Sequence, residues 1–345
     1  MTMTATDYLD LVKVTLRELG PMRFQQIAQT YQDLEVFPRW FKKDRVTFDH
    51  GIGIQRTLMT KIDENAARYV GFTEPDTTSI IDVLDQIQVN WVHMVTSWSL
   101  IFQTDLLMNR GKALVLNVLK PRRAAALIGL AELLERKAFG SPPSATNKTD
   151  PWGVQYWIVQ NASTGFNGGA ASGHTTKAGV DPTDATGFKN YTGTFGAVTK
   201  PDLIKSMRTA HRKCRFKSPV KIADYRSNLY DRYRIYTDET NISAFEDVGE
   251  GQNDNLGRDI ASMDGSMFFR KHPIIWIPYL DTMTNNPVYM IDMSTFYPVC
   301  LAGDYLRESD PVVNSNNHNT YTVNVDLTHN YLCVDPRRSA VFYKV

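Results

Sequence analysis

The feature that most constrains the fold is an alternation of apolar and polar residues near the C-terminus, from Thr320 to Val334. Apolar side chains at every second position fall on one face of an extended strand, and Thr, Asn and Asp fall on the other. The apolar set comprises Tyr321, Val323, Val325, Leu327, Tyr331 and Cys333. A strand of this length spans about 50 Å, whereas a typical strand has about five or six residues. The pattern therefore predicts a strand that runs the length of a large element.

A long helix is the natural neighbour for this strand. Residues 109–140 have leucines near helical spacing, with Asn109 suited to cap the start and Gly140 to end the helix. These leucines are Leu116, Leu119, Leu127, Leu130 and Leu134. Because Pro121 lacks a backbone N–H, we expect a kink there, or the start of a second helix.

Two short amphipathic helices are expected at the N-terminus. Leu9, Val12 and Leu16 lie on one face of the first, and Pro38 is expected to end the second, which begins near Phe24. Such a pair covers either the protein's own core or a neighbouring subunit. On the second interpretation, the three residues of the first helix are candidate intersubunit contacts.

An extended hairpin is expected over residues 44–103. Its second strand runs through residues 88–101 and carries apolar side chains on both faces. We therefore expect another surface to cover the hairpin. Lys61, Arg68 and Trp91 are the candidate intersubunit contacts in this segment.

Residues 141–197 are rich in Gly, Ser, Thr and Asn. Since a long loop within a compact domain is usually functional or mobile, we interpret this segment as a surface insertion. Its candidate anchor is the aromatic cluster Trp152, Tyr156 and Trp157.

Residues 199–305 alternate between helical and extended patterns, which indicates an α+β domain. A helix is expected to start at Thr199, with Asp202 completing its capping pattern, and another from residue 237 to about 248. Strands are expected at 233–236, 267–281 and 288–300.

The charges of the whole chain nearly cancel, with 38 Lys plus Arg against 37 Asp plus Glu, so the net charge does not require a nucleic-acid partner. The strongest basic run lies between Lys205 and Lys221. It is either a nucleic-acid contact or a solvated face with ion pairs across a subunit boundary. We favour the second interpretation because aromatic residues are not interleaved with the charges. Arg212 and Arg215 are candidate intersubunit contacts on this run.

The sequence lacks the motifs of the common enzyme classes, including GxSxG, HExxH and GxxxxGK[ST]. Its histidines show no metal-ligand spacing, and Asp254, Asp259 and Asp264 lie among turn residues that suit loop closure. We therefore expect no catalytic residues, no metal and no cofactor. With no long apolar run and no secretory pattern, we expect a soluble cytosolic chain without a membrane partner. Its three cysteines suit reduced core thiols.

Three C-terminal stretches carry a family resemblance. They are NDNLGRDIASMDGSMFFRKHPIIWIPYLD, from Asn253, then PVYMIDMSTF and YTVNVDLTHNYLCVDPRRSAVF. Together they resemble the major capsid proteins of tailed bacteriophages, which have the Hong Kong 97-like fold. The order of arm, hairpin, long helix, mixed domain and long final strand is similar to that of this family.

The resemblance implies an α+β capsid fold with an N-terminal arm (1–43), an E-loop (44–103), a peripheral domain with the spine helix (104–198), an axial domain (199–305) and a strand returning to the peripheral domain (306–345). It implies a structural protein that forms pentamers and hexamers of an icosahedral shell around double-stranded DNA. The implied partners are other copies of the chain, a portal, possible scaffolding and decoration proteins, and weak DNA contacts. The implied location is the virion, assembled in the host bacterial cytoplasm.

Other functions remain open at this stage. An encapsulin-type shell uses the same fold to enclose enzymes. A tail or decoration protein could bind glycans through the aromatic cluster of the insertion. An enzyme built on the three aspartates is a further alternative.

Overall fold

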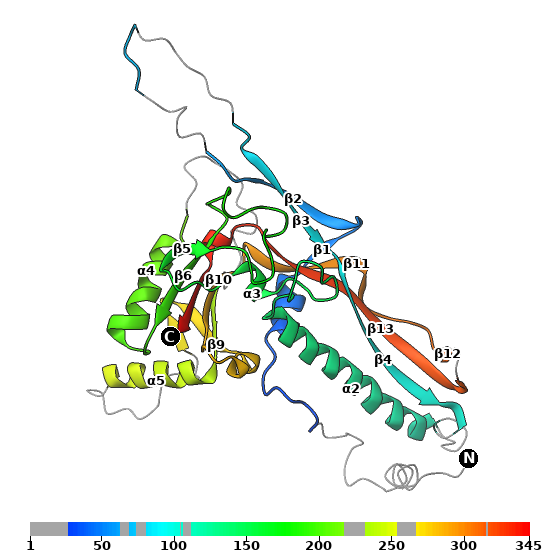
Figure 1. Ribbon diagram of the computed structural model, residues 1–345. Coiled ribbons are helices and arrows are strands. Elements are labelled where there is room, and N and C mark those ends of the chain that lie inside the picture. Colours follow the sequence, from blue (N-terminus) through cyan, green and yellow to red (C-terminus); the bar gives the residue numbers. More distant parts are fainter. Residues whose placement is uncertain are drawn as a thin grey trace.

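The computed structural model describes residues 27–62, 69–73, 81–103, 105, 112–216, 232–253, 267–314 and 317–345. The chain has the mixed α+β architecture expected from the sequence. It forms one elongated sheet beside a long helix, a second sheet covered by helices, and a ribbon that projects from the body (Figure 1).

The elongated sheet is built around the long C-terminal strand, which confirms the strongest sequence prediction. This strand, β13 (Asn317–Cys333), pairs antiparallel on one side with β11 (Phe296–Glu308) and β12 (Val312–Asn314), and on the other with β4 (Val92–Ile101). A short parallel strand, β1 (Val46–Phe48), completes the sheet. Apolar residues alternate inward as expected from Val323 to Leu327, but from Thr328 onward both faces of β13 are buried. The strand therefore runs from an exposed end into the centre of the core.

The long helix is also confirmed. Helix α2 (Lys112–Ala138) has 27 residues, spans about 40 Å, and continues through Pro121 without restarting. It runs along the elongated sheet (Figure 1), but its neighbouring strand is β4 rather than β13. The Arg122 guanidinium donates to the Ser99 carbonyl at 3.1 Å, and the Thr96 hydroxyl donates to the Ala126 carbonyl at 3.5 Å. The long strand thus meets the helix through an intervening strand.

The second sheet has the order β5-β6-β14-β10-β7-β9-β8. Its strands are β5 (Gly165–Gly168), β6 (Asn190–Phe195), β14 (Ala340–Lys344), β10 (Val288–Asp292), β7 (Tyr233–Thr237), β9 (His272–Trp276) and β8 (Met267–Phe269). On one face it packs against η3 (Lys200–Ile204), α4 (Lys205–Lys213) and α5 (Glu239–Asn253). The expected single strand over residues 288–300 was wrong. A turn at residues 293–295 separates β10 from β11, and these two strands belong to different sheets.

The start of η3 (Lys200–Ile204) differs in detail from the capping prediction. Thr199 makes no side-chain cap. Asp202 instead accepts hydrogen bonds from the backbone N–H groups of Gly196 and Ala197, at 2.8 and 3.0 Å. The carboxylate therefore fixes the loop that leads into η3 rather than completing a capping box.

The segment 141–197 is part of the core and not the surface insertion expected from its composition. It contains the short helix α3 (Val154–Trp157) and strands β5 and β6, and Val154, Ile158 and Phe188 are buried. Its polar backbone is satisfied by buried side chains. The Asn190 side chain, for example, accepts from the Val159 N–H and donates to the Val159 carbonyl, both at 2.9 Å. Despite its polar composition, the large apolar residues of this segment are buried or half-buried.

The N-terminal helical predictions need correction. Residues 27–34 are not helical, and a π-helix, η1 (Val36–Asp44), runs through Pro38 instead of ending there. Proline is tolerated in a first turn because N–H groups there have no intrahelical acceptor. The expected helix from Leu9 to Leu16 lies outside the described residues.

Helix η1 lies at the junction of the two sheets and α2. The Trp40 ring packs against Phe139 at the end of α2, Tyr236 of β7 and Tyr331 of β13, with centroid distances of 5.3, 5.6 and 6.0 Å. Its indole N–H donates to the Tyr236 hydroxyl at 2.8 Å. Trp40 and Phe41 are fully buried. The short helix η1 thus contacts the C-terminal end of α2 and both sheets.

Replacing the central tryptophan should destabilise the whole chain. We expect Trp40→Ala to lower the free energy of unfolding by about 3–5 kcal/mol, because it opens a cavity and removes an aromatic contact with each of the three parts. Urea denaturation of the unassembled chain measures this. The exposed Ile52 provides a control, since Ile52→Ala should change stability by less than about 0.5 kcal/mol. A Trp40→Ala loss as small as the control's would contradict the central role of Trp40.

A buried carboxyl on α2 holds the start of η1. Glu135 is fully buried, and its Oε2 accepts a hydrogen bond from the Val36 N–H at 2.8 Å. Burial raises the pKa of this carboxyl to about 8, although the backbone hydrogen bonds act in the opposite direction. The side chain is therefore mostly protonated in the folded protein at neutral pH.

This raised pKa makes stability depend on pH. Between the ordinary pKa of 4.5 and about 8, the folded chain binds a proton at Glu135 that the unfolded chain has released. The contribution of Glu135 to stability is therefore complete below pH 4.5 and is lost as pH rises through about 8, with a slope of up to about 1.4 kcal/mol per pH unit. Glu135→Gln keeps an acceptor for Val36 but cannot ionise. Urea midpoints at pH 5, 6, 7 and 8 should fall less for the variant than for the native chain, and parallel curves would contradict the assignment.

Candidate assembly surfaces

The projecting ribbon consists of β2 (Gly53–Met59) and β3 (Leu84–Asn90), paired antiparallel from Gly53 opposite Asn90 to Met59 opposite Leu84. It extends away from both sheets (Figure 1). A two-stranded ribbon is marginally stable in water on its own, so a structure of this kind depends on contacts with other elements.

The base of the ribbon finds such contacts within the chain. Ile54, Ile87 and Val89 are buried, and the Gln88 N–H donates to the Ala178 carbonyl at 3.0 Å. The expected continuous strand over residues 88–101 is divided at Trp91. Its first part remains in the ribbon as β3, and its second part leaves as β4 to pair with β13.

Trp91 forms the corner between these two strands. Its indole N–H donates to the Gly51 carbonyl at 2.9 Å, and its half-buried ring packs edge-on against Phe48 at 6.4 Å. Gly51 has a φ of 117°, which side-chain-bearing residues rarely adopt, so glycine permits this turn. Trp91 thus fixes the direction of the ribbon within its own chain, and its contact with a neighbouring subunit stays a prediction.

Further along the ribbon, apolar side chains are exposed in the described chain. The exposed set includes Met59, Ile62, Tyr69, Phe72 and Leu84. Lys61 is exposed beside Ile62, whereas Arg68 lies outside the described residues. Apolar exposure gathered on one projecting segment is typical of a contact surface.

The aromatic cluster of the 141–197 segment packs inward. Trp152 stacks on Tyr156 at 4.7 Å, and the Trp157 indole N–H donates to the Tyr331 carbonyl at 3.2 Å. The Tyr156 hydroxyl accepts from the Ala178 N–H at 2.8 Å. Because Tyr156 and Trp157 are buried, they provide no exposed platform on which a sugar ring could stack. The cluster instead fastens this segment to the long strand.

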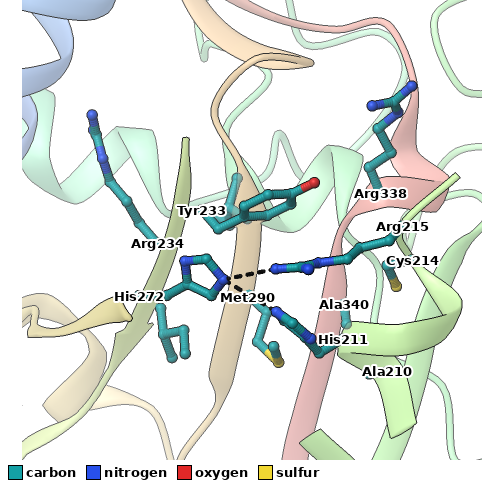
Figure 2. Close-up of a pocket in the computed structure, with 12 residues that line it drawn as sticks. Ala210, His211, Cys214, Arg215, Tyr233, Arg234, His272, Met290, Arg338 and Ala340 are labelled. Atoms are coloured by element: carbon teal, nitrogen blue, oxygen red, sulfur yellow. Dashed lines mark hydrogen bonds between the residues drawn. The ribbon is translucent and has the colours of Figure 1, made fainter. Parts of the chain in front are cut away.

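Two histidines that are distant in the sequence meet between α4 and β9 (Figure 2). Nε2 of His211 lies 3.1 Å from Nε2 of His272, which also accepts from the Arg215 guanidinium at 3.2 Å. Nδ1 of His211 accepts from Arg270 at 3.3 Å. Guanidinium groups only donate, so these contacts require both imidazoles to be neutral, with His211 donating through Nε2. The histidine pair therefore joins two arginines without any carboxylate.

The electrostatics agree with this arrangement. Burial, followed by the charge of Arg215, lowers the pKa of His211 to about 4, and the same two effects lower the pKa of His272. These residues show no metal or catalytic spacing in the sequence, and their pairing was not predicted. The available signal was that His211 falls on the buried face of α4, beside Ala210.

Acidification should therefore weaken the contact between α4 and β9. A histidine kept neutral by the fold contributes stability above its ordinary pKa of 6.5, and this contribution is lost as pH falls toward the folded pKa of about 4. The nearest opposing charge is Asp292, which raises the pKa of His272. We expect the unfolding temperature to fall more steeply between pH 6.5 and 4.5 in the native chain than in His211→Gln/His272→Gln. Scanning calorimetry measures this difference, and equal slopes would contradict the neutral pair.

The described residues offer no other centre for chemistry. Among them, no group of three His, Cys, Asp or Glu could hold a metal ion. Cys214, Cys300 and Cys333 are buried thiols, and burial raises the pKa of each. Asp254, Asp259 and Asp264 lie outside the described residues. In the part of the chain that is described, no helix is both long and apolar enough to cross a membrane.

Solved structures share this fold over nearly the whole chain. The capsid protein of cyanophage A-1(L) is 12% identical with a TM-score of 0.64, and the match covers 94% of this chain and 96% of that one. The capsid of the Myoviridae phage XM1 gives 8% identity, a TM-score of 0.55, and coverage of 100% and 99%. The SrpI encapsulin of Synechococcus elongatus PCC 7942 gives 11% identity, a TM-score of 0.51, and coverage of 99% and 96%. No protein-family model and no curated protein matches the sequence.

These likenesses define the class of fold. The chain has the Hong Kong 97-like fold of phage capsid proteins, as its sequence resemblance implied. The match covers 96% of the cyanophage A-1(L) subunit and 99% of the XM1 subunit.

Proposed function

We propose that this chain is the major capsid protein of a tailed bacteriophage and assembles as pentamers and hexamers into an icosahedral shell around double-stranded DNA. The observation that carries the proposal is an apolar ribbon, uncovered by its own chain, on a fold that matches phage capsid subunits along their full length. A buried cleft with convergent polar groups would favour an enzyme, whereas a projecting apolar segment favours association. We therefore assign a structural role and no catalytic one.

In this proposal, residues 1–43 form an arm and residues 44–103 an E-loop, and both reach neighbouring subunits. Residues 104–198 and 306–345 form the peripheral domain, and residues 199–305 the axial domain near the symmetry axes. Each subunit then makes many modest contacts. Closure of the shell makes these contacts act together, so the assembled shell is far more stable than one interface.

The further partners follow from the same assignment. A portal, possible separate scaffolding and decoration proteins, and weak contacts with packaged DNA belong to a shell of this type. The protein would be assembled in the host cytoplasm and end in the virion.

A second candidate is the shell of an encapsulin-type compartment, because the SrpI encapsulin shares the fold. The two functions differ in their cargo. Particles purified with their native contents should yield double-stranded DNA for a phage capsid, and a specific enzyme for an encapsulin.

The ribbon provides the test of assembly. We expect the native chain, expressed alone or with its neighbouring genes, to form capsomers or shells that sediment far faster than the monomer. Met59→Asp/Ile62→Asp should reduce assembly at least tenfold, because each carboxylate would be buried in an apolar interface. Analytical ultracentrifugation and negative-stain electron microscopy measure both.

A matched control separates assembly from folding. Val345 is an exposed apolar residue at the C-terminal end, away from the ribbon, so Val345→Asp should assemble normally. Circular dichroism should be unchanged in all variants. A native chain that stays monomeric under every condition would overturn the proposed function, and normal shells from the ribbon variant would exclude the ribbon as the contact.

A further inference from the structure

The cations of α4 lie on one exposed stripe. Lys205, Arg208, Arg212 and Arg215 are spaced by three or four residues, which places the first three on one side of the helix and Arg215 just beyond its end. All four side chains are exposed. Like charges at this spacing repel one another, so the stripe is unfavourable unless something neutralises it.

Most of the other arginines in the described chain are neutralised internally. Carboxylates lie within 4.0 Å of Arg39, Arg122, Arg123, Arg232, Arg234, Arg307, Arg337 and Arg338. No carboxylate of the described residues pairs with the stripe on α4, where Arg215 donates only to a neutral imidazole. Because these four exposed cations lie in one row without a carboxylate partner among the described residues, the stripe is suited to bind an acidic surface of another molecule.

Helix α5 carries the opposite charge. Glu239, Glu246 and Asp247 are exposed, the helix has no Lys or Arg, and none of these carboxylates forms an ion pair within the described chain. Glu239 and Glu246 are seven residues apart, or about 10 Å along the helix, the same separation as Lys205 and Arg212 on α4. The two helices therefore present complementary charges with matching spacing.

Both helices cover the same face of the second sheet, since Met207 of α4 and Phe245 of α5 pack into one cluster. Figure 1 shows α4 upright beside β6 and α5 lying across the lower end of that sheet. No ion pair joins the two helices within the described chain, so their charged sides are available to another molecule.

We infer that the basic stripe of α4 binds the acidic side of α5 from the next copy of the chain around a ring. This inference rests on the proposed function, because rings of identical subunits are joined by heterologous contacts that require two different, complementary surfaces on each copy. Opposite charges facing each other set the order and orientation of subunits and speed their encounter. Packaged DNA is the less favoured occupant, since the acidic α5 on the same sheet face would repel it.

Reciprocal charge reversal tests the contact. The first variant, Arg208→Glu/Arg212→Glu, places two carboxylates at the centre of the α4 stripe, opposite the native carboxylates of α5. The second, Glu246→Arg/Asp247→Arg, places two cations on the acidic side of α5, opposite the native stripe of α4. Each alone should reduce ring formation at least tenfold, while the conservative control Arg208→Lys/Arg212→Lys should assemble like the native chain. A chain carrying all four reversals should recover, because attraction returns with the charges exchanged.

Mixing the two reversed variants gives a sharper result. In a ring that alternates the two variants, the reversed α4 of the first variant meets the reversed α5 of the second. The native α4 of the second variant meets the native α5 of the first. Such alternation closes only in rings with an even number of subunits, so the mixture should form hexamers but not pentamers. Native mass spectrometry and electron microscopy distinguish the two.

The possible outcomes distinguish failure of the contact between α4 and α5 from failure of the proposed capsid function. If the native chain never assembles, the proposed function fails. If the native chain assembles and both reversed variants assemble equally well, the contact between α4 and α5 is overturned and the function stands. Intact shells that lose binding of a double-stranded DNA fragment only in Arg208→Glu/Arg212→Glu would assign the stripe to DNA and overturn the inference.

Discussion

The packing of η1 is the interaction on which the rest of the structure depends. Trp40 touches α2, the second sheet and β13 with a single side chain, and the ion pair between Asp44 and Arg234, at 2.7 Å, ties the end of η1 to β7. Because all three bury aromatic side chains against the same residue, η1 contributes to the relative orientation of the two sheets.

A rigid junction of this kind suits a protein that displays an extended ribbon. The base of the ribbon is anchored by Trp91, Ile87 and Val89, so its direction is set by the body of the protein. Its outer part is held by pairing between its own two strands but leaves apolar side chains such as Met59 and Leu84 exposed in the described chain. The free energy of covering them becomes available only on association, which links the stability of the ribbon to assembly.

The elements with strong periodicity could be predicted from the sequence. The helix at α2, the strand at β13 and the mixed α+β character follow from repeated apolar spacing, which depends only on local geometry. The failures share a different cause. The burial of residues 141–197, the division of the strand at Trp91 and the helix through Pro38 all depend on partners distant in the sequence, such as Tyr331, Gly51 and Glu135. Contacts between residues this far apart in the sequence cannot be predicted from local composition.

The candidate assembly surfaces could also be predicted only in part from the sequence. The basic run could be recognised from the sequence, but its meaning depends on what the fold does with the remaining charges. With 38 cations and 37 anions the chain is nearly neutral, and most of its described arginines find carboxylates within the same subunit. Among the charges left without an ion pair in the described chain, those of α4 are positive and those of α5 are negative. A subunit that was fully neutralised internally would have no preferred neighbour, whereas one with opposite charges on two helices favours a fixed order of copies. The whole chain can therefore be nearly neutral while α4 and α5 carry strong local charge. The fold places cations on one helix and carboxylates on the other.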